Sequence, residues 1–132
     1  MLLVLDGGLA TQVEKHLGYV LDTSLWSAQI LIEKPELIEE VHYEYYLAGA
    51  DAAITSSYQA CFENLRESGC ESPEDILLQS VKVAATARDR AWKVIQREKE
   101  FRREKPLVIA SCGCFGAVLA DGSVSRGIQL ML

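Results

Sequence analysis

Three short apolar runs, separated by long stretches with helical spacing, constrain most strongly what this chain can fold into. The runs cover residues 2–5, 52–55 and 107–110. Continuous apolar runs bounded by turn residues are typical of buried strands in a parallel sheet. Strands separated by helices run parallel and are joined by right-handed crossovers. The pattern therefore predicts an α/β fold, either a doubly wound sheet or part of a barrel.

The stretches between the runs predict helices. Pro35 suits the first position of a helix, and Gly49 supplies its end. A second helix is expected to begin at Ser72, as its N-cap, and to run to about residue 100. Shorter helices are predicted over residues 10–17 and 62–68. The apolar face of the second long helix is expected to comprise Leu77, Val81, Ala84, Ala91 and Ile95.

Composition excludes several classes of function. The net charge is −6, with acidic and basic residues mixed along the chain, so nucleic-acid binding is not expected. The basic stretch at residues 97–105 is interleaved with glutamates and is interpreted as a solvated helix end. No segment approaches the ~20 apolar residues that cross a membrane, and no signal-peptide core is present at the start. We therefore expect a cytoplasmic protein with reduced cysteines.

Small polar residues follow all three runs. Asp6, Gly7 and Gly8 follow the first, residues 55–59 (TSSYQ) end the second, and Ser111 follows the third. The carboxyl ends of parallel strands lie on one rim, where ligand sites of α/β proteins are found. After any single strand such residues are more often plain turn residues. Their recurrence after all three strands favours a site at this rim.

Individual residues carry both structural and functional interpretations. Asp6, beside two glycines that let a ligand approach the backbone, is a reasonable anchor for a substrate amine. Tyr58 is either a packed aromatic or a pocket hydroxyl, and Trp26 is either a core residue or a pocket wall. His16 and His42 are interpreted as helix-surface residues. Cys112 and Cys114 lack a recognisable second cysteine pair, so we do not predict a zinc site there.

The order of motifs resembles the homocysteine S-methyltransferase family. The opening LDGGLATQ (residues 5–12) and the later segment ITSSYQA (54–60) carry much of the resemblance. No single motif is specific, but their order and spacing together are. Further matching segments are SLWSA (24–28), PELI (35–38), VH (41–42), Tyr45, AGAD (48–51), GA (116–117) and LADGS (119–123).

The resemblance implies the N-terminal part of one (β/α)8 TIM-barrel domain over residues 1–132, about its first three β/α units. The family binds homocysteine at the carboxyl rim and activates its sulfur with a zinc ion held by cysteine thiolates. Its methyl donor is S-methylmethionine or S-adenosylmethionine, and its product is methionine. Transferred residue by residue, the resemblance suggests these substrate-binding positions: Asp6, Gly7, Gly8, Thr11, Trp26, Thr55, Tyr58, Gln59 and Ser111.

The chain also departs from the family. The zinc cysteines lie in later segments of the family's barrel, and none of the four cysteines here matches one. The fragment is therefore expected to bind no zinc, to hold no catalytic residue and to be inactive alone. A non-catalytic isoform that binds a partner is the alternative, and a small doubly wound binding domain is a third. Open sheet edges predict self-association.

Overall fold

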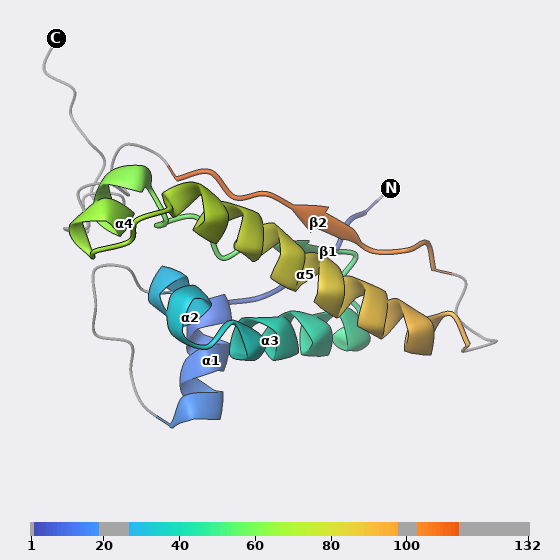
Figure 1. Cartoon of the computed structure of the whole chain (residues 1–132). Coiled ribbons are helices and arrows are strands. Elements are labelled where there is room, and N and C mark those ends of the chain that lie inside the picture. Colours follow the sequence, from blue (N-terminus) through green and yellow to red (C-terminus); the bar gives the residue numbers. More distant parts are fainter. Residues whose placement is uncertain (1, 19–26, 98–102, 114–132) are drawn as a thin grey trace, which may run out of the picture.

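The computed structural model describes residues 2–18, 27–97 and 103–113. In this part of the chain, three helices precede the first strand, and two more helices separate it from the second (Figure 1). Their bounds are α1 Leu9–Leu17, α2 Ser27–Glu33, α3 Pro35–Ala48, β1 Ala52–Ile54, α4 Phe62–Glu67, α5 Pro73–Ile95 and β2 Leu107–Ile109. Within these residues, no helix is long and apolar enough to cross a membrane.

The strands form a parallel sheet, which confirms the predicted α/β class. β1 pairs with β2 in a register that sets Ala52 opposite Leu107 and Ile54 opposite Ile109. The first apolar run joins the other edge of β1 through a single parallel bridge between Leu5 and Ala52. The predicted first strand is thus reduced to this bridge. The order in the sheet nevertheless follows the order in the chain.

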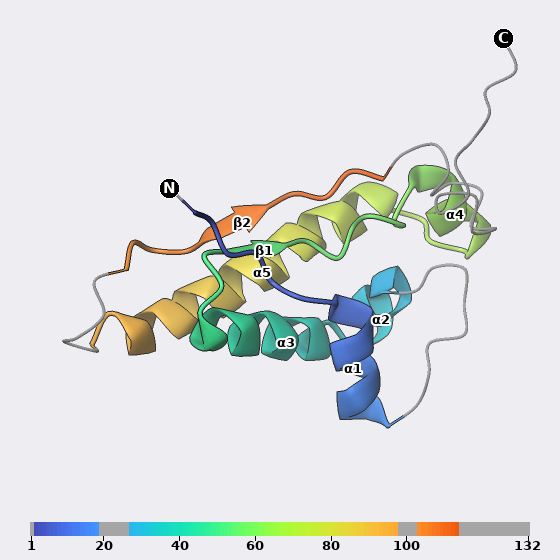
Figure 2. The same ribbon diagram turned by 180° about the vertical axis from the view of Figure 1, so that it is seen from behind.

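Two long helices cover one face of this sheet. α3 and α5 pack on each other, α3 contacts β1 and α5 contacts β2. Figures 1 and 2 show both helices running along the strands on this side. An aromatic residue, Tyr46 of α3, packs with Ala53 of β1 and with Ala87 and Ala91 of α5. The small alanines allow the helix backbone to approach the sheet closely.

The opposite face of the sheet is apolar and largely exposed. Side chains alternate between the faces of a strand. Because Ala53 faces the helices, the register places Leu5, Ile54, Leu107 and Ile109 on the other side. Leu5 is 47%, Leu107 53% and Ile109 37% exposed. We call these four residues the open sheet face.

Most helix predictions are confirmed, with three differences. α3 begins at Pro35 and ends where Gly49 adopts a φ of 115°, a left-handed conformation that favours glycine. α2 was not foreseen, and α5 ends at Ile95 rather than near residue 100. Val81 is exposed, because the buried row of α5 instead follows residues 80, 84, 87, 91 and 95.

One arginine of the basic stretch is a structural residue, so the interpretation of that whole stretch as solvated was wrong. Arg103 Nη2 donates to the carbonyls of Gly49 (2.9 Å) and Ala50 (2.7 Å) and to Asp51 Oδ1 (2.9 Å). The other oxygen of Asp51 accepts the Val4 N–H at 2.9 Å. The bonds from Val4 and Arg103 lower the pKa of Asp51. The sheet is therefore tied together at the amino ends of its strands.

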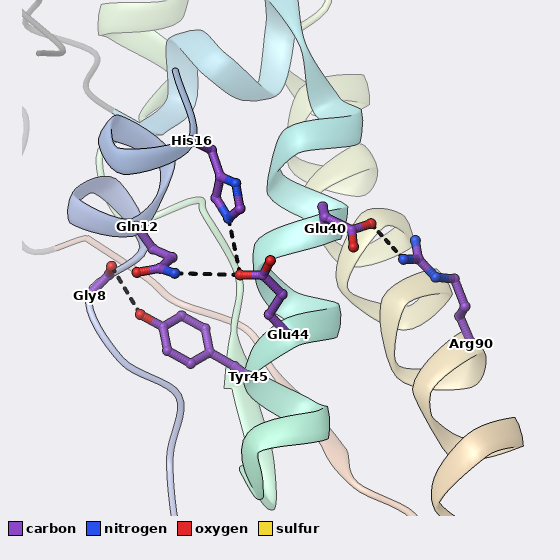
Figure 3. Close-up of polar contacts among 7 residues, drawn as sticks. All are labelled: Gly8, Gln12, His16, Glu40, Glu44, Tyr45 and Arg90. Carbon is purple, nitrogen blue, oxygen red and sulfur yellow. Dashed lines mark hydrogen bonds and ion pairs between the residues drawn. The ribbon is translucent and has the colours of Figure 1, made fainter. Parts of the chain in front are cut away.

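α1 is attached to α3 by polar contacts (Figure 3). Glu44 Oε2 lies 3.0 Å from His16 Nε2 and accepts a longer bond of 3.4 Å from Gln12. The hydrogen bond with His16 is the main cause that lowers the pKa of Glu44. His16 is exposed, as predicted. On the other side of α3, Arg90 of α5 pairs with Glu39 and Glu40.

The open sheet face predicts that the isolated chain self-associates. Exposed apolar faces and open strand edges both favour association. Sedimentation velocity across a concentration series is expected to show species heavier than a monomer. Leu107→Lys combined with Ile109→Lys should shift the distribution towards monomer. Leu78→Lys is the matched control, because Leu78 is exposed on α5 rather than on the sheet. A monodisperse wild-type monomer with a sharp cooperative melt would contradict the prediction.

Candidate functional site

A cavity of about 220 Å³ lies at the carboxyl ends of the parallel segments. Its walls come from the residues after Leu5, from the end of β1 and from the residues after β2. The sequence predicted a site at this rim. The lining residues are Asp6, Gly7, Leu9, Ile54, Thr55, Ser56, Tyr58 and Ser111.

The structure brings together five of the nine predicted site residues. These five are Asp6, Gly7, Thr55, Tyr58 and Ser111, all of which line the cavity. Gly8 and Thr11 belong to the start of α1, and Gln59 is half-buried beyond β1; these three are not among the lining residues. Trp26 lies outside the described residues.

The carboxylate of Asp6 is the only charged side chain among the residues that line this cavity. The side chain is 3% exposed, and its Oδ2 accepts the backbone N–H of Ile54 at 3.0 Å. That bond fixes the carboxylate against β1. The backbone before it is equally fixed, because Asp6 N–H donates to the Ala52 carbonyl at 3.0 Å. The chain therefore holds one acidic group rigidly at the wall.

Gly7 is required by a close approach of Tyr45 from α3. A Cβ atom at Gly7 would lie 2.8 Å from the Tyr45 hydroxyl and 3.0 Å from two of its ring carbons. The hydroxyl donates to the Gly8 carbonyl at 3.2 Å (Figure 3). Burial, followed by the negative charges of Asp6 and Glu44, raises the pKa of Tyr45. The phenol therefore remains a neutral donor at neutral pH.

Three polar groups close a ring that joins β1 to the segment after β2. Ser57 Oγ donates to the Ser111 carbonyl at 2.8 Å, and Ser111 N–H donates to Thr55 Oγ1 at 2.9 Å. The two hydroxyls lie 2.7 Å apart. A serine hydroxyl has a single proton. Because Ser57 gives its proton to the carbonyl, Thr55 must donate to Ser57. Thr55 and Ser111 thus build the cavity wall through bonds to each other.

Comparison with known proteins identifies the family. The homocysteine S-methyltransferase family model matches residues 3–130. The chain belongs to this family. It is similar to homocysteine S-methyltransferase YbgG of Bacillus subtilis, with 49% identity over 128 residues, 96% of this chain and 40% of that protein. Homocysteine S-methyltransferase 1 of Arabidopsis thaliana is 47% identical over 94% of this chain and 38% of its own length.

A solved structure agrees with the sequence comparisons. The metallated form of the Escherichia coli homocysteine methyltransferase MmuM superposes with a TM-score of 0.83 at 42% identity. The match covers 96% of this chain and 42% of the E. coli chain. The chain thus spans about 40% of the length of these relatives, consistent with their N-terminal portion.

Three contributors to this part of the chain were not among the nine predicted site residues. Leu9 and Ser56 line the cavity, and the buried Ser56 Oγ has no hydrogen-bond partner among the described residues. His42 was predicted on a helix surface but is fully buried. It lies four positions from both Ile38 and Tyr46, which are buried on α3, and this helical spacing was the available signal.

The described residues do not fit a metal site. Within them, no cluster of three or more His, Cys, Asp or Glu side chains is placed to hold a metal ion. Cys112 is exposed, while Cys61 and Cys70 are half-buried. Cys114 lies outside the described residues. A zinc ion held only by this described part of the chain is therefore not supported.

A second hollow of about 290 Å³ lies at the other, amino ends of the strands. It is larger than the first, and its lining includes Leu2, Leu107, Asp51 and Arg103. The charges of Asp51 and Arg103 already pair with each other. We therefore place the candidate site at the carboxyl ends, where an acidic group faces a cavity.

The ring of hydrogen bonds among Thr55, Ser57 and Ser111 predicts that loss of the Thr55 hydroxyl lowers the stability of the fold. Thr55→Val is expected to lower the free energy of unfolding by about 2–3 kcal/mol, because buried partners lose their hydrogen bonds. Thr55→Ser keeps the hydroxyl and removes one methyl group, so its cost should stay near ~1 kcal/mol. Urea denaturation of both variants measures the difference. Equal unfolding midpoints for the two variants would show that the ring does not stabilise the fold.

The two neighbouring glycines are expected to respond differently to alanine. Gly7→Ala should cost about 1–3 kcal/mol, because the new methyl group overlaps Tyr45. Gly8→Ala is the control: its nearest contact would be Thr11 Oγ1 at an ordinary 3.5 Å. It should change stability by less than ~0.5 kcal/mol. Thermal melts of the two variants give the comparison, and a neutral Gly7→Ala would refute the close-packing argument.

Proposed function

We propose that this chain forms the first part of a (β/α)8 barrel and carries one side of the homocysteine site of a homocysteine S-methyltransferase. The observation that carries the proposal is the fixed Asp6 carboxylate at a cavity on the carboxyl rim. Parallel segments in chain order, covered on one face by helices, support the barrel. In a barrel the open sheet face would become interior, because side chains fill the inside of such barrels.

The chemistry of the cavity suits the amino acid end of homocysteine. Its ammonium group is complementary to the Asp6 carboxylate, since a charged acceptor makes strong hydrogen bonds. Ser56 and Tyr58 add hydroxyl groups at the same wall. Asp6 supplies the only charge among the lining residues, so the wall favours a cationic group over an anion. We assign substrate binding, and no catalytic step, to these residues.

Methyl transfer belongs to the longer protein in this proposal. The donor would be S-methylmethionine or S-adenosylmethionine, and the product methionine. The family's zinc would be held by segments that correspond to the remainder of the relatives, because the described residues do not fit it. We place the protein in the cytoplasm. The open sheet face also supports the alternative, a non-catalytic chain that binds a partner through this face.

A chimera tests the proposed activity. Residues 3–130 would replace the matching segment of the E. coli enzyme, and methyl transfer from S-methylmethionine to homocysteine would be assayed with and without added zinc. The chimera is expected to be active and the 132-residue chain alone inactive. Asp6→Asn in the chimera should raise KM for homocysteine by about tenfold or more, as expected for losing a charged partner.

The parental E. coli enzyme, assayed in parallel, is the positive control. A folded chimera without methyl transfer would contradict the proposal and favour the partner-binding alternative. Zinc-dependent turnover by the 132-residue chain alone would show that the metal ligands lie within it. Cys112 and Cys114 would then be the first residues to replace.

A further inference from the structure

A buried histidine stands next to the acidic group of the cavity. His42 Nδ1 lies 3.6 Å from Asp6 Oδ2, with the histidine side chain 0% and the aspartate side chain 3% exposed. This separation is longer than a hydrogen bond. Neither ring nitrogen of His42 has a hydrogen-bond partner among the described residues. A fully buried polar side chain without partners is rare and calls for an explanation.

The position of His42 relative to the cavity suggests that explanation. Asp6 is among the residues that line the cavity, whereas His42, which lies 3.6 Å from its carboxylate, is not. Both recorded contacts of the carboxylate, with Ile54 N–H and with His42, involve the same oxygen, Oδ2. Oδ2 therefore already contacts groups within the protein. This arrangement leaves the carboxylate able to present Oδ1 to a ligand.

The negative charge of Asp6 acts on two tyrosines of α3. Burial, first, and the Asp6 charge both raise the pKa of Tyr45. The same two causes contribute to raising the pKa of Tyr46 to about 12. His42, Tyr45 and Tyr46 are neighbours on one helix. An ionised aspartate in such a place needs donors to hold it, because an unpaired buried charge is costly.

The second histidine of the chain provides a contrast. His16 also faces a carboxylate, that of Glu44, but this pair is exposed and makes a hydrogen bond of 3.0 Å. Solvent can reach both side chains of that pair, which are 35% and 39% exposed. The buried pair has no such alternative. Hydrogen bonds at binding sites are often long before a ligand arrives and shorten in the complex.

We propose that His42 is a positioning residue, whose Nδ1–H holds Oδ2 of Asp6 so that the carboxylate keeps its orientation towards a ligand ammonium group in the cavity. This inference rests on the proposed function for the identity of the ligand, but not for the pairing itself. An ionised carboxylate only accepts hydrogen bonds, so the pairing requires the tautomer with the proton on Nδ1. Ligand binding should shorten the contact between Nδ1 and Oδ2.

The first arm of the test reads the pairing directly, in the full 132-residue chain. Long-range ¹H–¹⁵N spectra report which imidazole nitrogen carries the proton. We expect His42 to carry it on Nδ1, and this resonance to move in Asp6→Asn. The His16 resonances should stay unchanged in that variant. A proton on Nε2 alone, or no response to Asp6→Asn, would overturn the proposal.

The second arm measures binding of L-homocysteine to the same chain by NMR titration under reducing conditions. His42→Leu should weaken binding by about tenfold or more, as expected for losing a hydrogen bond to a charged group. His42→Asn keeps a donor near the Nδ1 position and should recover most of the affinity. His16→Gln is the matched control and should bind like the wild type. Unchanged binding by a folded His42→Leu variant would overturn the proposal.

The two arms separate failure of this inference from failure of the proposed function. A wild-type chain that binds no homocysteine would count against the proposed function, while the tautomer and its response to Asp6→Asn still decide the pairing. Should His42→Leu not fold, as judged by circular dichroism, the comparison of His42→Asn with the wild type replaces it. Binding by His42→Asn that is weakened as much as in Asp6→Asn would contradict a role for the Nδ1 donor.

Discussion

The parallel alignment of three chain segments is the constraint on which the other features depend. Leu5 bridges to Ala52, and β1 pairs with β2, so all three segments point in the same direction. α3 and α5 cover one face of them and pack on each other. Because the segments are parallel, the residues that follow them must meet at one edge. The cavity is a direct consequence of this alignment.

Each end of the sheet is held by a different kind of polar contact. At the amino ends, Asp51 and Arg103 join β1 to the first segment and to the end of α3. At the carboxyl ends, hydroxyl groups of Thr55 and Ser57 join β1 to Ser111. Such contacts are needed because the strands are short. They also explain why polar residues follow strands for structural as well as functional reasons.

The site combines this scaffold with a single buried acid. Asp6 is fixed by the backbone of β1 and faced by His42, while Tyr45 closes the space above Gly7. Family membership and the superposition on the E. coli enzyme agree with this arrangement of helices and strands. The chain corresponds to about 40% of the length of its relatives, and the apolar side chains of its open sheet face are exposed.

The sequence by itself determined the features that depend on local chemistry. Pro35 and Gly49 mark the ends of α3 because each acts through its own backbone preference. The order of strands and helices, and the placement of Asp6, Thr55 and Ser111 after strands, followed from apolar runs and turn residues. The family was also readable from motif order. These signals do not depend on which distant segments come into contact.

Only the tertiary structure decided which polar residues were buried and which groups they contact. His42 and Arg103 looked like surface residues, because the local sequence does not indicate which distant groups contact a polar side chain. Their partners, Asp6 and Asp51, lie 36 and 52 positions away in the chain. Thr55 likewise proved to be a member of a hydrogen-bonded ring. Long-range pairing of this kind depends on the packing of α3 and the sheet, which no short stretch of sequence encodes.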